Sequence, residues 1–112
     1  MTKFAFISRH NPSKEQFTLA NEQGIELVHI GDLDAFSVSI EDIPEHFEGV
    51  IVVHPMMALR LSYYYPIGVF ENSIRSSEGD KPQFFASKLV IWRSYSHDYK
   101  LERKLYRSNS HD

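Results

Sequence analysis

The sequence has no cysteine and lacks several motifs that mark common functional classes. Without cysteine the chain forms no disulfide, holds no iron–sulfur cluster or cysteine-ligated zinc, and offers no thiol nucleophile. Its five glycines are dispersed, and they form neither the G-x-G-x-x-G loop of dinucleotide-binding proteins nor the phosphate loop that ends in G-K-S/T. An ordinary dinucleotide cofactor is therefore not expected.

Long apolar runs and a dominant charge of one sign are also missing. The longest apolar runs fall far short of the roughly 20 residues that a membrane-spanning helix needs. The first residues lead directly into an apolar strand pattern rather than into a charged segment followed by an apolar one, so we expect a cytoplasmic protein. The 12 basic and 15 acidic side chains give a formal charge of −3, and duplex DNA is therefore not an expected partner.

Apolar segments alternate with helical patterns along the chain. Short apolar runs rich in β-branched and aromatic residues predict strands at 3–8, 25–30, 49–53, 67–71 and 84–92. Capping signals at Ser13 and Pro55 predict helices at 14–23 and 56–64. This order predicts an α/β fold: a Rossmann-like, mostly parallel sheet of four to five strands, with helices on both faces and the last strand at an edge. Residues 1–93 are predicted to form one domain, and 94–112 a polar, mobile tail.

Polar side chains follow the ends of the predicted strands. In open parallel sheets ligands bind beyond the carboxyl ends of the strands, which share one rim. Arginine suits phosphate groups, and the helix starts add backbone amide donors. We therefore expect a single pocket for a phosphorylated or nucleotide-like ligand, lined by Ser8, Arg9, His10, Asn11, Ser13, Asp32, His54, Asn72, Ser73 and Arg75.

Less specific interpretations of these residues stay open. Polar residues at strand ends are ordinary in loops, His54 stands at a common type of helix entry, and Asp32 follows a turn-forming glycine. Ser8, His10 and Asp32 are also compatible with a catalytic triad, although no nucleophile elbow marks one. None of the six histidines has the spacing of a metal site on one helical turn, so neither a metal nor a cofactor is expected.

One set of residues in the first third of the chain points to a family. The set comprises Phe6-Ile7-Ser8-Arg9-His10, Pro12, Gln23-Gly24-Ile25, His29 and Leu33-Asp34. In this order it resembles a small stand-alone family of CRISPR-associated ring nucleases, single-domain relatives of the CARF (CRISPR-associated Rossmann-fold) sensors. Two features differ from the family pattern: Asn11 stands between His10 and Pro12, and the segment 71–93 is unlike the family's.

The resemblance implies a specific ligand and reaction. Such proteins bind cyclic oligoadenylates, the second messengers of type III CRISPR defence, in a cleft across a homodimer, and cyclic tetra-adenylate is the first candidate here. They cut the ring without metal, because a ribose 2′-hydroxyl attacks the adjacent phosphorus. By this resemblance Arg9 would neutralise the phosphate, while Ser8 and Asn72 would hold ribose or phosphate oxygens. His10 would act as general acid or base, since histidine changes charge near neutral pH.

Two other functions remain open at this point. The same residues would serve a non-catalytic nucleotide sensor or sponge, which binds without forming products. Alternatively, the chain is a protein–protein adaptor of a mobile genetic element that acts through Tyr63–Tyr65 and the basic tail.

Overall fold

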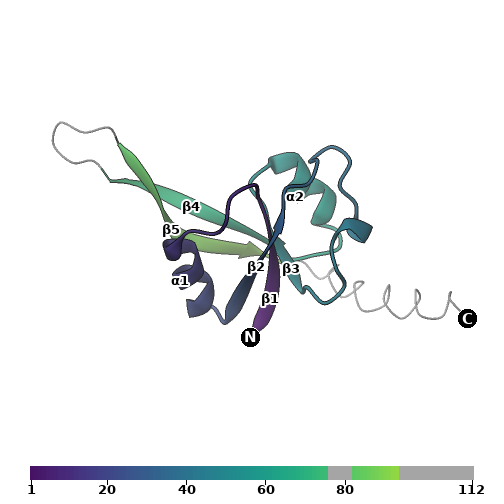
Figure 1. Ribbon diagram of the computed structural model, residues 1–112, viewed down its shortest axis with the longest axis horizontal. Helices are drawn as coiled ribbons and strands as arrows, with labels where there is room; N and C mark the ends of the chain where they lie inside the picture. Colours follow the sequence, from purple (N-terminus) through teal and green to yellow (C-terminus); the bar gives the residue numbers. More distant parts are fainter. Residues whose placement is uncertain (76–81, 94–112) are drawn as a thin grey trace, which may run out of the picture.

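The computed structural model describes residues 1–75 and 82–93, and in this part the chain forms five strands and two α-helices (Figure 1). The strands form one sheet in the order β2-β1-β3-β4-β5, in which β1 to β4 are parallel and β5 is antiparallel to β4 at the edge. The prediction of an α/β fold with a mostly parallel sheet is confirmed. The elements in chain order are β1 (Thr2–Ile7), α1 (Lys14–Glu22), β2 (Ile25–Gly31), the 3-10 turn η1 (Ile40–Asp42), β3 (Gly49–Ile51), α2 (Pro55–Leu61), β4 (Ile67–Arg75) and β5 (Gln83–Trp92).

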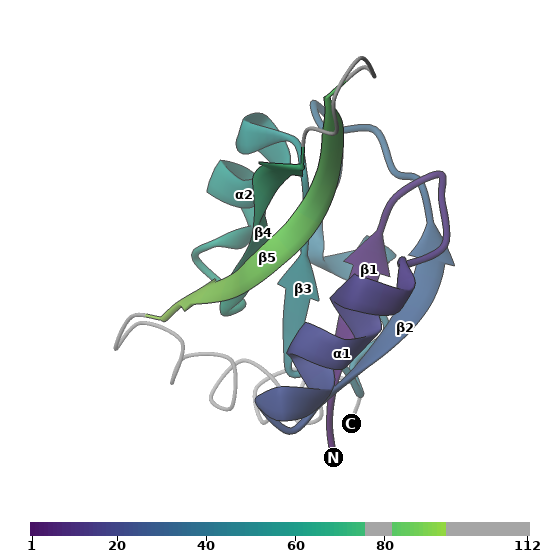
Figure 2. The same ribbon diagram turned by 90° about the vertical axis from the view of Figure 1, so that its left-hand side faces the viewer.

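Two apolar clusters lie on the central strands. Phe4 of β1 belongs to one cluster and its neighbour Ala5 to the other, because successive side chains of a strand point to opposite faces. From α1, Ala20 joins the cluster of Phe4, and from α2, Met57 joins the cluster of Ala5. In Figure 2 α1 lies in front of β1 and β2. The central strands are thus covered by packed side chains, and their carboxyl ends are held in place.

The local signals at the ends of α1 act as expected. Ser13 Oγ accepts a hydrogen bond from the Gln16 amide (3.2 Å), and Gln16 Oε1 accepts one from the Ser13 amide (2.8 Å), which completes a capping box. The helix ends before Gly24, whose φ of 73° lies in the left-handed region. Gln23 Nε2 then donates to the Leu89 carbonyl (2.8 Å) and ties the helix to β5.

The predicted end of β4 is wrong. The sequence predicts a strand at 67–71 followed by a loop, whereas β4 continues to Arg75 because its backbone pairs with β5 up to the Arg75–Gln83 pair. The resulting hairpin projects from the body of the sheet (Figure 1). The position of Asn72, Ser73 and Arg75 therefore differs from the prediction: they are strand residues on a hairpin and not loop residues on the rim of the sheet.

The tail predicted at 94–112 lies outside the described residues. Within the described ranges, neither helix has the length and apolar character that crossing a membrane requires.

Candidate functional site at the ends of β1 and β3

A hollow of about 520 Å³ opens beyond the carboxyl ends of β1 and β3. From β1 the chain continues to β2, which lies on one side of β1, and then to β3, which lies on the other side of β1. The order of the strands therefore reverses between β1 and β3. Such switch points are where open α/β sheets bind ligands, and the volume lies in the range of small-molecule sites. The hollow is lined by Ile7, Ser8, Arg9, His10, Asp32, Leu33, Asp34, Ala35, Phe36, Val53, His54 and Met57.

The segment after β1 is held against β2. His29 Nε2 lies 2.6 Å from the Ser8 carbonyl oxygen, and since a carbonyl only accepts, His29 donates from Nε2. The Ser8 amide donates to the Gly31 carbonyl (3.1 Å), and Ser8 Oγ accepts from the His10 amide (3.1 Å). These bonds fix the backbone that carries Arg9 and His10 at the hollow. From the sequence, His29 in its strand was also interpreted as a packed or hydrogen-bonded residue, and the bond to Ser8 confirms that interpretation.

Arg9 and His10 are both exposed at this hollow. The Arg9 side chain makes no hydrogen bond or ion pair with any residue in the described part of the chain. A guanidinium that the protein does not itself pair is available to a phosphate or carboxylate of a ligand, which it binds with two parallel hydrogen bonds.

Asp32 reaches the hollow through an irregularity in β2. The register between β1 and β2 shifts by one residue, so that Phe6 pairs with His29 and Ile7 with Gly31. Gly31 has a φ of 92°, a conformation that glycine adopts without strain, and Asp32 follows directly. In nucleotide-binding α/β proteins an acidic residue after the second strand hydrogen-bonds the ribose hydroxyls. The position of Asp32 is compatible with that role.

His54 has a defined tautomer. It is the N-cap of α2, and its Nδ1 accepts a hydrogen bond from the Met56 amide (3.1 Å). An accepting Nδ1 carries no proton, so the neutral ring carries its proton on Nε2. The helix-entry interpretation of His54 is therefore confirmed. The same residue also presents an N–H donor at the hollow that contains Arg9 and His10.

Phe36 is a residue of the hollow that the sequence analysis missed. Its side chain is 68% exposed, and its ring stands edge to face with the His54 ring, with 5.5 Å between the centroids. The Phe36 amide donates to Asp34 Oδ1 (2.9 Å), and the Val38 amide donates to the Asp34 carbonyl (2.8 Å). Arg60 Nε of α2 donates to the Val38 carbonyl (3.0 Å). The available signal was Asp34, since aspartate commonly caps such turns.

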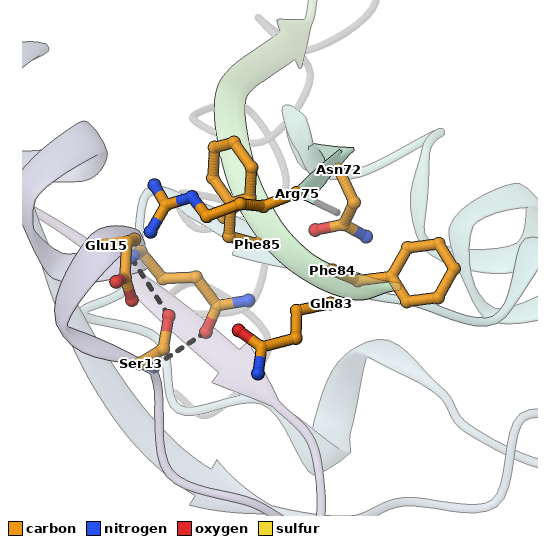
Figure 3. A pocket seen from close by; sticks show the side chains of 9 residues that line it. Ser13, Glu15, Asn72, Arg75, Gln83, Phe84 and Phe85 are labelled. Atoms are coloured by element: carbon orange, nitrogen blue, oxygen red, sulfur yellow. Dashed lines mark hydrogen bonds between the residues drawn. The ribbon is translucent and has the colours of Figure 1, made fainter. Parts of the chain in front are cut away.

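A second hollow of about 300 Å³ contains three of the residues predicted for the first one, namely Ser13, Asn72 and Arg75 (Figure 3). It lies between the start of α1 and the β4–β5 hairpin. The Arg75 guanidinium carbon lies 4.6 Å from the centroid of the Phe85 ring. At the other end of the hairpin, the Val52 amide bonds to the Gly68 carbonyl, so Gly68 is level with the end of β3. Seven residues of about 3.3 Å each place Arg75 roughly 20 Å beyond that point.

The expectation of a single pocket is therefore corrected. The structure brings together Ser8, Arg9, His10, Asp32 and His54 at one hollow, and Ser13, Asn72 and Arg75 at another. Asn11 is exposed and lines neither hollow, and Ser73 Oγ donates to Ser87 Oγ (2.8 Å) instead.

The other chemistries weighed for these residues find less support. A catalytic triad requires the His10 ring to bond both Ser8 and Asp32, and among the described residues it bonds neither. In the same ranges, no three histidine, aspartate or glutamate side chains are grouped as a metal site would need. Of the three tyrosines weighed for an adaptor surface, Tyr65 is fully buried and Tyr63 is about half exposed.

Comparison with known proteins finds no match among protein-family models, curated proteins or solved structures. The geometry of the hollow is therefore the basis on which a function is proposed below.

Proposed function

We propose that this chain is a cytoplasmic, homodimeric protein with a Rossmann-like fold and helices on both faces, which binds a cyclic oligoadenylate and cleaves it without metal. By this proposal it is similar to the stand-alone CRISPR-associated ring nucleases and regulates type III CRISPR signalling. Cyclic tetra-adenylate is the first ligand to test. The enzyme would be a phosphodiesterase that leaves 2′,3′-cyclic phosphate products.

One observation carries the proposal: Arg9, His10, Asp32 and His54 come from three different strand ends and line one hollow at the switch point of the sheet. Each group matches one part of a nucleotide. The guanidinium suits the phosphate, the carboxylate suits ribose hydroxyls, the His10 imidazole suits proton transfer, and the Nε2–H of His54 suits a hydrogen bond to a ligand oxygen. This assignment of one group to each part of the nucleotide explains why an acidic residue lines a site for an anion. Asp32 would face the sugar, and Arg9 would face the phosphate.

The proposed reaction needs little beyond positioning and proton transfer. The 2′-oxygen forms a bond to the neighbouring phosphorus as the bond from phosphorus to the 5′-oxygen breaks. His10 takes the proton of the 2′-hydroxyl, and a solvent water molecule gives a proton to the departing 5′-oxygen. His54, whose neutral ring carries its proton on Nε2, donates a hydrogen bond to that oxygen. Arg9 binds the non-bridging oxygens, where negative charge increases in the transition state.

A homodimer would double this constellation. Cyclic tetra-adenylate is one ring in which the phosphate groups repeat. A two-fold axis would present two copies of Arg9 and two copies of His10 to that ring. The two copies of Arg9 would gather positive charge at the phosphates, although the formal charge of each chain is −3. Light scattering on the purified protein, with and without the ring, tests whether two copies associate.

The decisive experiment incubates the purified protein with cyclic tetra-adenylate in the presence of EDTA. We expect linear products with a 2′,3′-cyclic phosphate, and we expect His10→Ala to lower kcat by about 10²- to 10⁴-fold, as is usual when a general acid or base is removed. His46→Ala is the matched control, since His46 is exposed outside the hollow. Binding without products would identify a sensor or sponge instead. No binding would refute the proposal.

A further inference from the structure

The hollow at the ends of β1 and β3 is lined by both polar and apolar side chains. Ser8, Arg9, His10 and Asp32, from the ends of β1 and β2, contribute polar groups. Two of the apolar lining side chains, Phe36 and Val53, are 68% and 80% exposed. A ligand that fills this space has a charged part and an apolar part.

Phe36 is held in its exposed position by its surroundings. Asp34 accepts the Phe36 amide at 2.9 Å, and Arg60 of α2 fixes the following turn through the Val38 carbonyl at 3.0 Å. The His54 ring meets the Phe36 ring edge to face, at 72° between the ring planes. The His54 ring leaves at least one face of the Phe36 ring uncovered, because an edge-to-face contact covers one face of one ring only.

We infer that Phe36 is the base-stacking residue of the site and that the hollow takes one nucleotide unit, with its base against Phe36 and its phosphate at Arg9. This inference rests on the proposed nucleotide site and adds a determinant of specificity to it. An exposed aromatic ring in a hollow that also holds polar groups suits a planar base better than an alkyl chain, since stacking gains from the π-face as well as from apolar contact. The polar side chains meanwhile provide the groups for sugar and phosphate.

The test compares adenosine 5′-monophosphate with ribose 5-phosphate, which lacks the base, in equilibrium titrations of the full chain. We expect the wild type to prefer the nucleotide by about 5- to 150-fold, the range that one base–aromatic stack supports. Phe36→Leu should lose most of this preference and keep its affinity for ribose 5-phosphate, while Phe36→Tyr should retain the preference.

Two further measurements separate stacking from a structural effect. In NMR spectra the adenine H2 and H8 signals should move upfield on binding to the wild type and to Phe36→Tyr, and not on binding to Phe36→Leu. Phe84→Leu is the matched control, because Phe84 is 71% exposed but lines the second hollow, and it should behave as the wild type does.

Failure of the inference and failure of the proposed function give different results. If the wild type binds both compounds equally, or if Phe36→Leu discriminates as well as the wild type, the stacking role is wrong even when cyclic tetra-adenylate is cleaved. If the base preference depends on Phe36 but cyclic tetra-adenylate is neither bound nor cut, the stacking role stands and the cyclic substrate is wrong. If the wild type binds neither nucleotide nor sugar phosphate, both are wrong.

Discussion

The separation of Arg9 from Arg75 leads to a prediction in which each arginine is the control for the other. Arg9 lines the hollow at the ends of β1 and β3, whereas Arg75 lies on the hairpin and lines the second hollow. We expect Arg9→Ala to weaken the binding of cyclic tetra-adenylate and Arg75→Ala to leave it within about twofold to threefold of the wild type.

The magnitudes follow from what each side chain contacts. A hydrogen bond to a charged group contributes about 1.5–3 kcal/mol, so the loss of Arg9 should lower affinity by about 10- to 150-fold. Arg9 is exposed and has no protein partner among the described residues, so its removal should change the free energy of unfolding by less than about 0.5 kcal/mol. Arg75 lies over the Phe85 ring, and losing this cation–π contact should cost about 0.5–1 kcal/mol of stability.

Two assays read these effects independently. Isothermal titration with the ring measures affinity, and urea unfolding followed by circular dichroism measures stability. Arg9→Lys should lie between Arg9→Ala and the wild type in affinity, because lysine keeps the charge but not the two-pronged geometry. Equal weakening of binding by Arg75→Ala and Arg9→Ala would refute the separation of the two sites, since the ligand would then contact the hairpin as well as the end of β1.

Three further predictions concern the scaffold that positions the site. Gly49→Ala should lower the free energy of unfolding by about 1–3 kcal/mol, because an added Cβ would stand 2.5 Å from the buried Phe4 ring, and an unchanged urea midpoint would contradict this packing. Ser13→Ala should cost about 1 kcal/mol through loss of the helix cap, with the exposed Ser37→Ala as a control that should cost nothing measurable. His29→Phe should weaken ligand binding because the Ser8 carbonyl loses its hydrogen-bond donor. His29→Gln supplies another donor and should restore part of the affinity. Equal binding of the ligand by the two variants would exclude the positioning role of His29.

Several parts of the fold were predictable because they depend on neighbours in the sequence. The capping box at Ser13, the stop at Gly24 and the helix entry at Pro55 are confirmed, since each depends on contacts within about four residues. The positions of the strands, apart from the end of β4, were also predicted closely, and the buried strands β1 and β3 are marked by runs of apolar residues because both of their faces are covered. Half of the predicted site residues consequently lie at one hollow: those at the ends of β1, β2 and β3.

The arrangement of the remaining residues depended on contacts between distant segments. β4 continues to Arg75 because its backbone amides and carbonyls pair with those of β5, and every residue carries these groups whatever its side chain. The polar sequence at 72–75 therefore held no sign that the strand would continue and carry Arg75 away from Arg9. In the same way, the turn that follows Phe36 is tied to α2 by a hydrogen bond from Arg60 Nε to the Val38 carbonyl, 22 residues earlier in the chain. Local sequence determined which segments are helices and strands, and long-range backbone pairing determined which of their polar ends meet.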